Sequence, residues 1–271
     1  MGKVKIKVFD TIFSHNPYSC LNCESEHMEW VVNPIEINDG DVVFFTENDI
    51  HRVVNYGNNN IKKIGWLLES PAIINQNIVF QYIDYFDEIY TCREDFLNIS
   101  QKFKFLPVWC TWIKVEDRKI YEKSKMVSII ASYKRQTNGH MLRHSVISNF
   151  NDNVDIFGSG YNVISDKIIG LKDYRFSIVI ENTKQNFYFT EKLIDCFQTG
   201  TVPIYWGCPS INKFFNEKGM LVFDNGDELF EILNNLTIEK YIEMFPFVEE
   251  NFKIANGYKT AEDYLKNYNM F

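Results

Sequence analysis

The sequence lacks any apolar run long enough to cross a membrane, because none reaches the roughly 18 consecutive residues that a spanning helix requires. Its opening stretch, MGKVKIKVFD, alternates between apolar and polar side chains as a strand does, and it lacks the apolar core of a signal peptide. No lipid-anchor signal is evident. We therefore predict a cytoplasmic protein without a transmembrane segment.

The chain also lacks an excess of positive charge. It has 28 Lys and Arg residues against 36 Asp and Glu residues, which gives a formal net charge of −8. Nucleic acids and anionic membrane surfaces require a broad basic face, whereas a phosphorylated small molecule requires only a local basic pair. We therefore expect no nucleic-acid partner.

Patterns that bind metals are scarce. Six cysteines are scattered, and only Cys20 and Cys23 have C-x-x-C spacing, without a second pair to complete a zinc site, so we interpret them as free thiols in a reducing compartment. Asp39-Gly40-Asp41 resembles the D-x-D of many sugar transferases, but it lies in a turn before a strand. Of the five histidines, only His140 and His144 could share a helix face, and surface or capping positions are favoured for both. We expect no bound metal.

Length and composition indicate a globular protein of two domains. The chain has 271 residues, of which 45% are apolar and 24% charged. The aromatic share of 16% is high. Most of these rings should lie in the core, although sugar-binding clefts also favour them.

The order of patterns predicts an open α/β fold in both halves. Strand-like and helix-like segments alternate before and after a charged stretch, KVEDRKIYEKSK at Lys114–Lys125, which is the best candidate linker. Apolar, β-branched runs in the second half suggest a doubly wound parallel sheet. We predict one domain over 1–118, a second over 119–250, and a helical segment over 251–271.

The stretch from Arg175 to Phe215 carries most information about function. An apolar run at Phe176–Ile180 predicts a buried strand, Thr190 is typical of a helix N-cap, and Val202–Trp206 predicts the next strand. A helix N-terminus beside parallel strand ends suits a phosphate. Lys192 lies in the first helical turn, where the helix dipole disfavours a cation, so it is better explained by a bound anion; a solvated surface lysine is the alternative.

Two further charged residues are candidates for a site. Glu69 ends the apolar strand IGWLLESP, where a carboxylate can act as a general base or can be an ordinary strand-end acid. Arg143, in the predicted helix MLRHSVISNF, can bind a diphosphate or form a surface ion pair.

The segment ENTKQNFYFTEKLIDCFQTGTVPIYWG resembles the donor-binding motif of the α-1,3/1,4-fucosyltransferases, glycosyltransferase family 10. The ESP sequence at Glu69 also resembles the part of that family that holds its catalytic glutamate. The resemblance implies a GT-B-like α/β fold, in which two Rossmann-like domains face each other across a cleft and a C-terminal helix returns to the first domain. The first domain would bind the acceptor and the second GDP-fucose.

The resemblance also implies roles for particular residues. Glu69 would deprotonate the acceptor hydroxyl, while Arg143 and Lys192 would hold the β-phosphate side of GDP. The remaining residues of the motif, Asn182, Tyr188 and Glu191, match positions around the donor. The implied reaction is an inverting, single-displacement transfer of fucose from GDP-fucose to an oligosaccharide hydroxyl, α-1,3 in type, without a required metal.

Two other functions stay open. The same fold could use another nucleotide sugar, because a small change in the pocket can alter donor choice. Alternatively, the chain could bind a glycan or a nucleotide without catalysis, although a retained base speaks against this. The pattern predicts neither the acceptor nor the oligomeric state.

Overall fold

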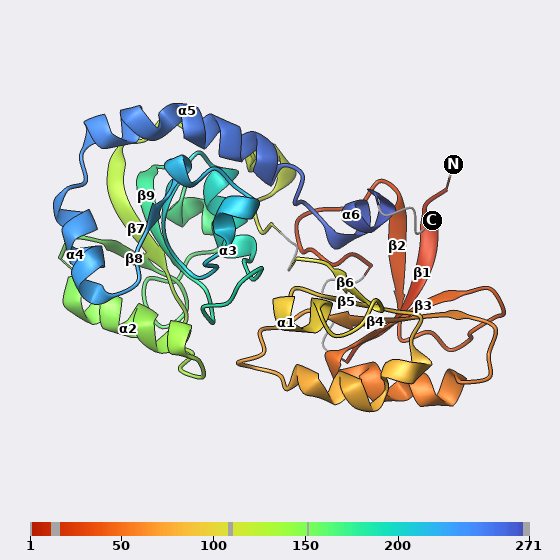
Figure 1. Cartoon of the computed structure of the whole chain (residues 1–271). Coiled ribbons are helices and arrows are strands. Elements are labelled where there is room, and N and C mark those ends of the chain that lie inside the picture. Colours follow the sequence, from red (N-terminus) through yellow and green to blue (C-terminus); the bar gives the residue numbers. More distant parts are fainter. Residues whose placement is uncertain (1, 12–16, 108–110, 151, 268–271) are drawn as a thin grey trace. The chain divides into compact units, whose positions relative to one another are not determined.

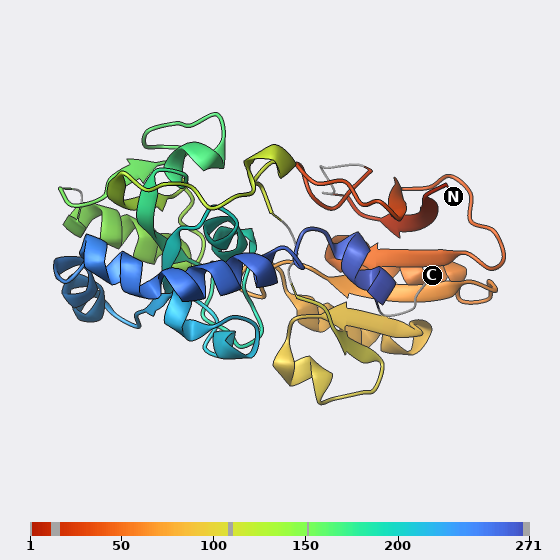
Figure 2. The ribbon, with the colours of Figure 1, turned by 90° about the horizontal axis from the view of Figure 1, so that it is seen from above.

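The structure is a computed structural model that describes residues 2–11, 17–107, 111–150 and 152–267, and it contains two compact units (Figures 1 and 2). One unit comprises Met1–Cys110 with Thr260–Phe271, and the other comprises Thr111–Lys259. Each unit is built around its own sheet of parallel strands. The predicted α/β fold with two Rossmann-like units is confirmed.

The first unit contains a six-stranded parallel sheet in the order β2-β1-β3-β4-β5-β6. Its strands are β1 (Val4–Phe9), β2 (Met28–Val32), β3 (Val42–Thr46), β4 (Lys62–Leu67), β5 (Glu88–Thr91) and β6 (Phe103–Phe105). Short helices connect them: the 3-10 helices Glu47–Tyr56, Gln76–Gln81 and Ile83–Tyr85, and α1 (Glu94–Leu97). Strand side chains such as Val43, Phe45 and Ile89 pack with these helices in one core.

The second unit contains a five-stranded parallel sheet in the order β11-β10-β9-β7-β8. Its strands are β7 (Lys125–Ile130), β8 (Asp155–Phe157), β9 (Tyr174–Ile180), β10 (Val202–Trp206) and β11 (Leu221–Val222). Its longer helices are α2 (Asn138–Phe150), α3 (Glu191–Phe197), α4 (Gly226–Asn234) and α5 (Ile238–Ala255). The strand order reverses between β7 and β9, which makes this pair the topological switch point of a doubly wound sheet.

Alternate residues of β9 face two different helical layers. Phe176, Ile178 and Ile180 share a core cluster with side chains of α2, α4 and α5. Val179 points the other way, into a cluster that contains Leu193 of α3. Because both faces are covered, the run Phe176–Ile180 is buried and mainly apolar, as its sequence predicted, with Ser177 as its one polar residue.

Helix α5 is the longest of the described helices, with 18 residues. It buries Tyr241, Met244 and Val248, which recur at the expected three- and four-residue spacing. Among the residues described, no helix combines the length and the apolar character needed to cross a membrane.

The C-terminal helix α6 (Ala261–Asn267) packs on β2 of the first unit. The buried carboxylate of Glu262 accepts hydrogen bonds from the backbone N–H of Ser19 at 2.5 Å and from the indole N–H of Trp30 at 2.7 Å. These bonds explain why this part of the chain returns to the first unit.

The divisions between the units differ from those that the sequence pattern suggested. The second unit begins at Thr111, whereas the sequence pattern predicted a start at residue 119. It begins earlier because Thr111 and the backbone N–H of Trp112 donate hydrogen bonds to Asp195 of α3. The second unit ends at Lys259, whereas the sequence pattern predicted an end at residue 250. It ends later because all of α5 packs within this unit.

Candidate functional site

The carboxyl end of β9, which pairs with β7 at the switch point, lies next to the N-terminus of α2. The backbone N–H of Gly139 donates a 3.2 Å hydrogen bond to the carbonyl oxygen of Asn182, just beyond β9. A Cβ atom on Gly139 would lie only 1.8 Å from the carbonyl oxygen of Glu181, so only glycine permits this approach. The first turn of α2 is thereby held at the switch point, where open α/β sheets bind ligands.

Arg143 of α2 is buried at this place, with 5% of its surface exposed. Its Nε donates to the carbonyl oxygen of Ile180 at 2.9 Å, and its Nη2 donates to that oxygen and, at 3.0 Å, to Oδ1 of Asn182. No carboxylate of a described residue lies within ion-pair distance of the guanidinium. Burial lowers the pKa of Arg143, while the charges of Glu181 and Glu191 act in the opposite direction. The alternative interpretation of Arg143 as half of a surface ion pair is therefore wrong.

The N-terminus of α3 is built around a buried carboxylate, Glu181. Thr190, the N-cap, donates to Glu181 through its backbone N–H at 2.9 Å and through its hydroxyl at 2.7 Å. Glu181 has no exposed surface, and this burial raises its pKa, while Lys192 acts in the opposite direction. The carboxylate thus ties the end of β9 to the start of α3.

Lys192 is an ion-paired residue at the start of α3. Its Nζ lies 3.6 Å from Oε2 of Glu181 and 3.2 Å from Oε1 of Glu191, and it donates to the hydroxyl of Thr190 at 3.0 Å. Its side chain keeps 26% of its surface exposed. The amine is therefore held at the helix N-terminus and is still accessible from solvent, so it is not simply a solvated surface lysine.

Glu191 belongs to a buried ion network. It pairs with Lys192 and, at 3.2 Å, with Lys167, which also pairs with Asp195 at 3.0 Å. Burial favours a raised pKa for Glu191, but the charges of Lys167 and Lys192 outweigh it and hold that pKa below its usual range. The carboxylate stays ionised and restrains the lysine beside it.

Sequence reasoning missed Lys167 and Asp195, the other members of this network. Asp195 stands in the otherwise apolar helix segment LIDCF, one turn after Glu191. A carboxylate at a core-facing position needs a buried partner, and that rule could have identified Asp195. Lys167 lies in a 3-10 helix, Lys167–Gly170, and no local pattern marks it.

The two other residues of the motif have different environments. Asn182 is half-buried and holds the guanidinium of Arg143, as described above. Tyr188 is buried, with 1% of its surface exposed, and its backbone N–H donates to the carbonyl oxygen of Gln185 at 3.3 Å. The structure thus brings Arg143, Asn182, Glu191 and Lys192 to the strand ends of the second unit, and Tyr188 lies in the same loop.

Glu69 lies in the first unit, just after β4, and is half-buried. Its Oε1 accepts the backbone N–H of Ser70 at 2.7 Å, as an ordinary turn acid can. Its own backbone is held by Glu47 and Gln76: the Glu47 carboxylate accepts its N–H, and the Gln76 amide donates to its carbonyl oxygen at 2.7 Å.

The histidines of α2 correct one expectation. Surface or capping positions were favoured for His140 and His144, but both side chains are buried. The ring nitrogens of His144 contact the hydroxyl of Tyr161 and, at 3.0 Å, the carbonyl oxygen of Lys134. The Nδ1 atom of His140 has no hydrogen-bond partner among the described residues.

Asp41, the second acid of the stretch that resembles D-x-D, is paired with a lysine. Asp41 forms an ion pair with Lys7 and accepts the backbone N–H of Asn38. Burial acts to raise the pKa of Asp41, but the bonds from Lys7 and Asn38 outweigh it and lower that pKa. Within the described ranges, no group of three or more His, Cys, Asp or Glu residues could hold a metal ion.

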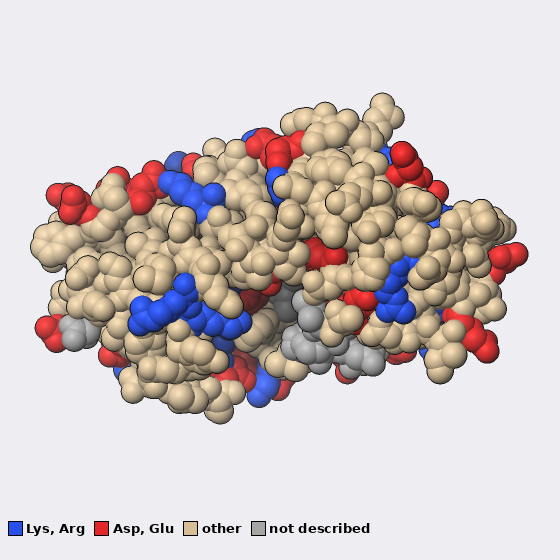
Figure 3. Space-filling view, turned by 90° about the horizontal axis from the view of Figure 1, so that it is seen from below, with Lys and Arg blue, Asp and Glu red and all other residues tan. Residues whose placement is uncertain are grey.

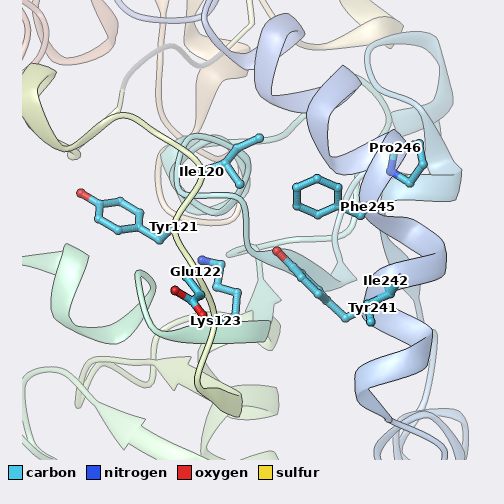
Figure 4. Close-up of a pocket in the computed structure, with 8 residues that line it drawn as sticks. All are labelled: Ile120, Tyr121, Glu122, Lys123, Tyr241, Ile242, Phe245 and Pro246. Carbon is cyan, nitrogen blue, oxygen red and sulfur yellow. The ribbon is translucent and has the colours of Figure 1, made fainter.

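A pocket of about 570 Å³ in the second unit is a separate feature (Figure 4). Tyr241 and Phe245 of α5 face the extended segment Ile120–Lys123 across it. The Lys123 amine donates to the carbonyl oxygens of Leu171, Lys172 and Thr199 and to the hydroxyl of Thr201. The lining is mainly apolar and its lysine is used internally, so this pocket does not suit a diphosphate.

Basic side chains are concentrated on part of the second unit. Figure 3 looks from the side on which α2 lies in Figure 1, and there the Lys and Arg side chains of this unit gather mainly in one group. Separately, the loop before α2 carries two exposed basic residues, Lys134 and Arg135. A local group of this kind suits a small anion.

The second unit therefore has a doubly wound α/β fold with cations at its switch point. The model of a family described as "Glycosyltransferase family 10 (fucosyltransferase) C-term" matches residues 120–269, which is 150 of the 271 residues. The chain belongs to glycosyltransferase family 10.

Individual relatives agree with this assignment. The alpha-(1,3)-fucosyltransferase FucT of Helicobacter pylori is 41% identical over 90 residues, which cover 31% of this chain and 19% of that protein. A crystal structure of an alpha1,3-fucosyltransferase has a TM-score of 0.61 at 20% identity, covering 99% of this chain and 89% of that one. Another crystal structure, of an alpha1,3-fucosyltransferase with GDP-fucose, has a TM-score of 0.59 at 21% identity. The match covers 94% of this chain and 89% of that one. At such identities the structures show the fold, which is GT-B-like.

Proposed function

We propose that this chain is an inverting fucosyltransferase that transfers fucose from GDP-fucose to an oligosaccharide hydroxyl, with α-1,3 linkage. The observation that carries the proposal is Arg143, a guanidinium with 5% exposure and no carboxylate partner among the described residues. A buried charge without a counter-ion is unfavourable, so the site calls for an anion. The similar proteins named above include an alpha1,3-fucosyltransferase with GDP-fucose, which supports the diphosphate of GDP as that anion.

Arg143 and Lys192 have complementary roles in this proposal. The guanidinium of Arg143 is fixed by Ile180 and Asn182, whereas Lys192 keeps part of its side chain accessible. Both residues lie beside helix N-termini, whose backbone N–H groups favour negative charge. Together they stabilise the charge that develops on GDP as it leaves.

The chemical step is a single displacement. The acceptor oxygen forms a bond to the anomeric carbon of fucose on one face, while the bond from that carbon to the β-phosphate oxygen breaks on the other face. Glu69 takes the proton of the acceptor hydroxyl, and GDP leaves with the electron pair. We propose that the protein cations stabilise this leaving group without a resident metal ion.

The remaining motif residues position these groups. Asn182 restrains the guanidinium of Arg143, and Glu191 restrains the amine of Lys192. Tyr188 supports the loop between β9 and α3 from inside. We propose that these three residues shape the donor site around the nucleotide and the sugar.

A donor panel tests the proposal. Thermal unfolding is followed with GDP, GDP-fucose, GDP-mannose and UDP-galactose, and transfer to oligosaccharide acceptors is then measured. At about 100 times Kd a ligand adds about 2.7 kcal/mol to the free energy of unfolding, which raises Tm by several degrees. We expect GDP and GDP-fucose to stabilise the protein. Stabilisation by another nucleotide sugar alone would contradict the choice of fucose, and no response to any nucleotide would contradict donor binding.

A further inference from the structure

His140 lies in the first turn of α2, one turn before Arg143, and no role is assigned to it above. Its backbone N–H donates to the hydroxyl of Thr137 at 3.2 Å, so the turn itself is capped. The side chain is 4% exposed, and its Nδ1 has no hydrogen-bond partner among the described residues. Buried polar atoms are nearly always satisfied, so an unpaired one needs an explanation.

The surroundings of the ring are cationic. Burial is the main cause that lowers the pKa of His140 to about 4, and the charges of Arg143, Lys134, Lys192 and His144 add to this effect. The imidazole is therefore neutral near neutral pH. A neutral ring still has one N–H to donate, and it does not add a further charge to the site.

The position of the ring agrees with a ligand contact. Gly139, its neighbour, is pressed against the chain that leaves β9, and Arg143 bonds that same chain. His140 therefore belongs to the turn of α2 that meets the end of β9, where we place the diphosphate. An anion there is attracted by the two cations and by the N-terminus of α2, and it brings hydrogen-bond acceptors to the unpaired nitrogen.

We infer that His140 is a further donor-binding residue, whose Nδ1–H donates a hydrogen bond to a phosphate oxygen of the nucleoside diphosphate; this inference rests on the proposed function. His144, one turn further along α2, provides the contrast. Both of its ring nitrogens already contact protein atoms, namely the hydroxyl of Tyr161 and the carbonyl oxygen of Lys134. His144 is therefore a structural histidine and a suitable control.

Three substitutions separate a ligand contact from a structural role. His140→Leu removes both ring nitrogens at similar size. In His140→Asn the amide nitrogen can occupy a place near Nδ1, whereas in His140→Gln it falls nearer to Nε2. Affinity for GDP is measured by calorimetry, and Tm is measured without ligand.

We expect His140→Leu to bind GDP about tenfold more weakly, as for the loss of one hydrogen bond to a charged group. Its ligand-free Tm should equal or exceed that of the wild type, because a buried unpaired nitrogen has been removed. His140→Asn should retain most of the affinity, and His140→Gln should not. His144→Ala should show the reverse pattern, with a lower Tm and a smaller effect on GDP affinity.

The outcomes are distinguishable. If the wild type binds no GDP, the proposed function fails, and this inference fails with it. If the wild type binds GDP and His140→Leu binds it equally tightly, only the role of His140 is overturned. Should the Leu variant not fold, the Asn and Gln variants decide, since equal GDP affinity in those two would overturn the assignment of Nδ1.

Discussion

The buried carboxylate of Glu47 accepts a hydrogen bond from the backbone N–H of Glu69, the residue that we propose as the catalytic base. The same oxygen accepts the N–H of Leu68 and faces the amide of Gln76 at 3.4 Å. Glu47 begins the 3-10 helix after β3, so it joins the ends of β3 and β4. The backbone that carries Glu69 is thereby fixed, while its side chain stays half-buried.

Replacement of the proposed base should separate catalysis from binding. Glu69→Gln keeps the size of the side chain but removes its basicity, so we expect turnover to fall by about 10²- to 10⁴-fold. GDP affinity should not change, because the nucleotide binds the other unit in our proposal. Initial rates with GDP-fucose and a responsive acceptor, beside a GDP titration, provide the measurement. Full activity in this variant rules out Glu69 as the base.

Glu47 should give the protein a pH-dependent stability. Burial raises its pKa to about 7, from an unfolded value of 4.5. Between pH 4.5 and pH 7 the folded state therefore binds more protons than the unfolded state. The contribution of Glu47 to the free energy of unfolding is complete below pH 4.5 and is lost as the pH rises through 7. The loss amounts to at most about 3 kcal/mol. When the free energy of unfolding is measured with urea from about pH 5 to 8, we expect it to fall less steeply with pH in Glu47→Gln than in the wild type. An identical dependence on pH in the variant would contradict the assignment.

Lys192 and Arg143 should contribute to GDP affinity in different ways. Lys192→Ala removes an accessible charge, and we expect GDP binding to weaken by about 1.5 to 3 kcal/mol. Arg143→Lys keeps a charge but loses the planar fork that bonds Ile180 and Asn182, so GDP affinity should fall by at least about tenfold. Arg175→Lys is the matched control, because that side chain is half-buried and donates to the carbonyl oxygen of Lys125 outside the site. Calorimetric titration with GDP measures all three, and unchanged affinity for the first two would remove them from the site.

Gly139 should tolerate no side chain. A Cβ atom there would lie 1.8 Å from the carbonyl oxygen of Glu181, and that backbone cannot move without displacing β9. We expect Gly139→Ala to lower the free energy of unfolding by about 3 kcal/mol or more and to weaken GDP binding, since α2 and β9 would separate. Gly226→Ala is the control, because a Cβ on Gly226 meets nothing within 4 Å. Equal Tm values for the two variants would show that the close approach is unimportant.

Local sequence was sufficient for much of the fold. The run Phe176–Ile180 of β9 is mainly apolar because both faces of the sheet are covered, and Thr190 caps α3 as its position in the sequence predicted. Period and capping are local properties, so a single sequence reveals them. The motif from Glu181 onward also predicted the family, because its residues and their spacing are specific.

The tertiary structure decided which charges are paired. Nothing in the sequence shows that Lys167 reaches both Glu191 and Asp195, or that Arg143 is buried without a carboxylate among the described residues. It also reversed the expectation for His140, since a helix pattern does not show which side chain lies against the switch point. The sequence alone indicated most of the strands, their order and the family, because these depend on neighbours along the chain. Burial and charge pairing depend on neighbours in space, and only the packed units supply them.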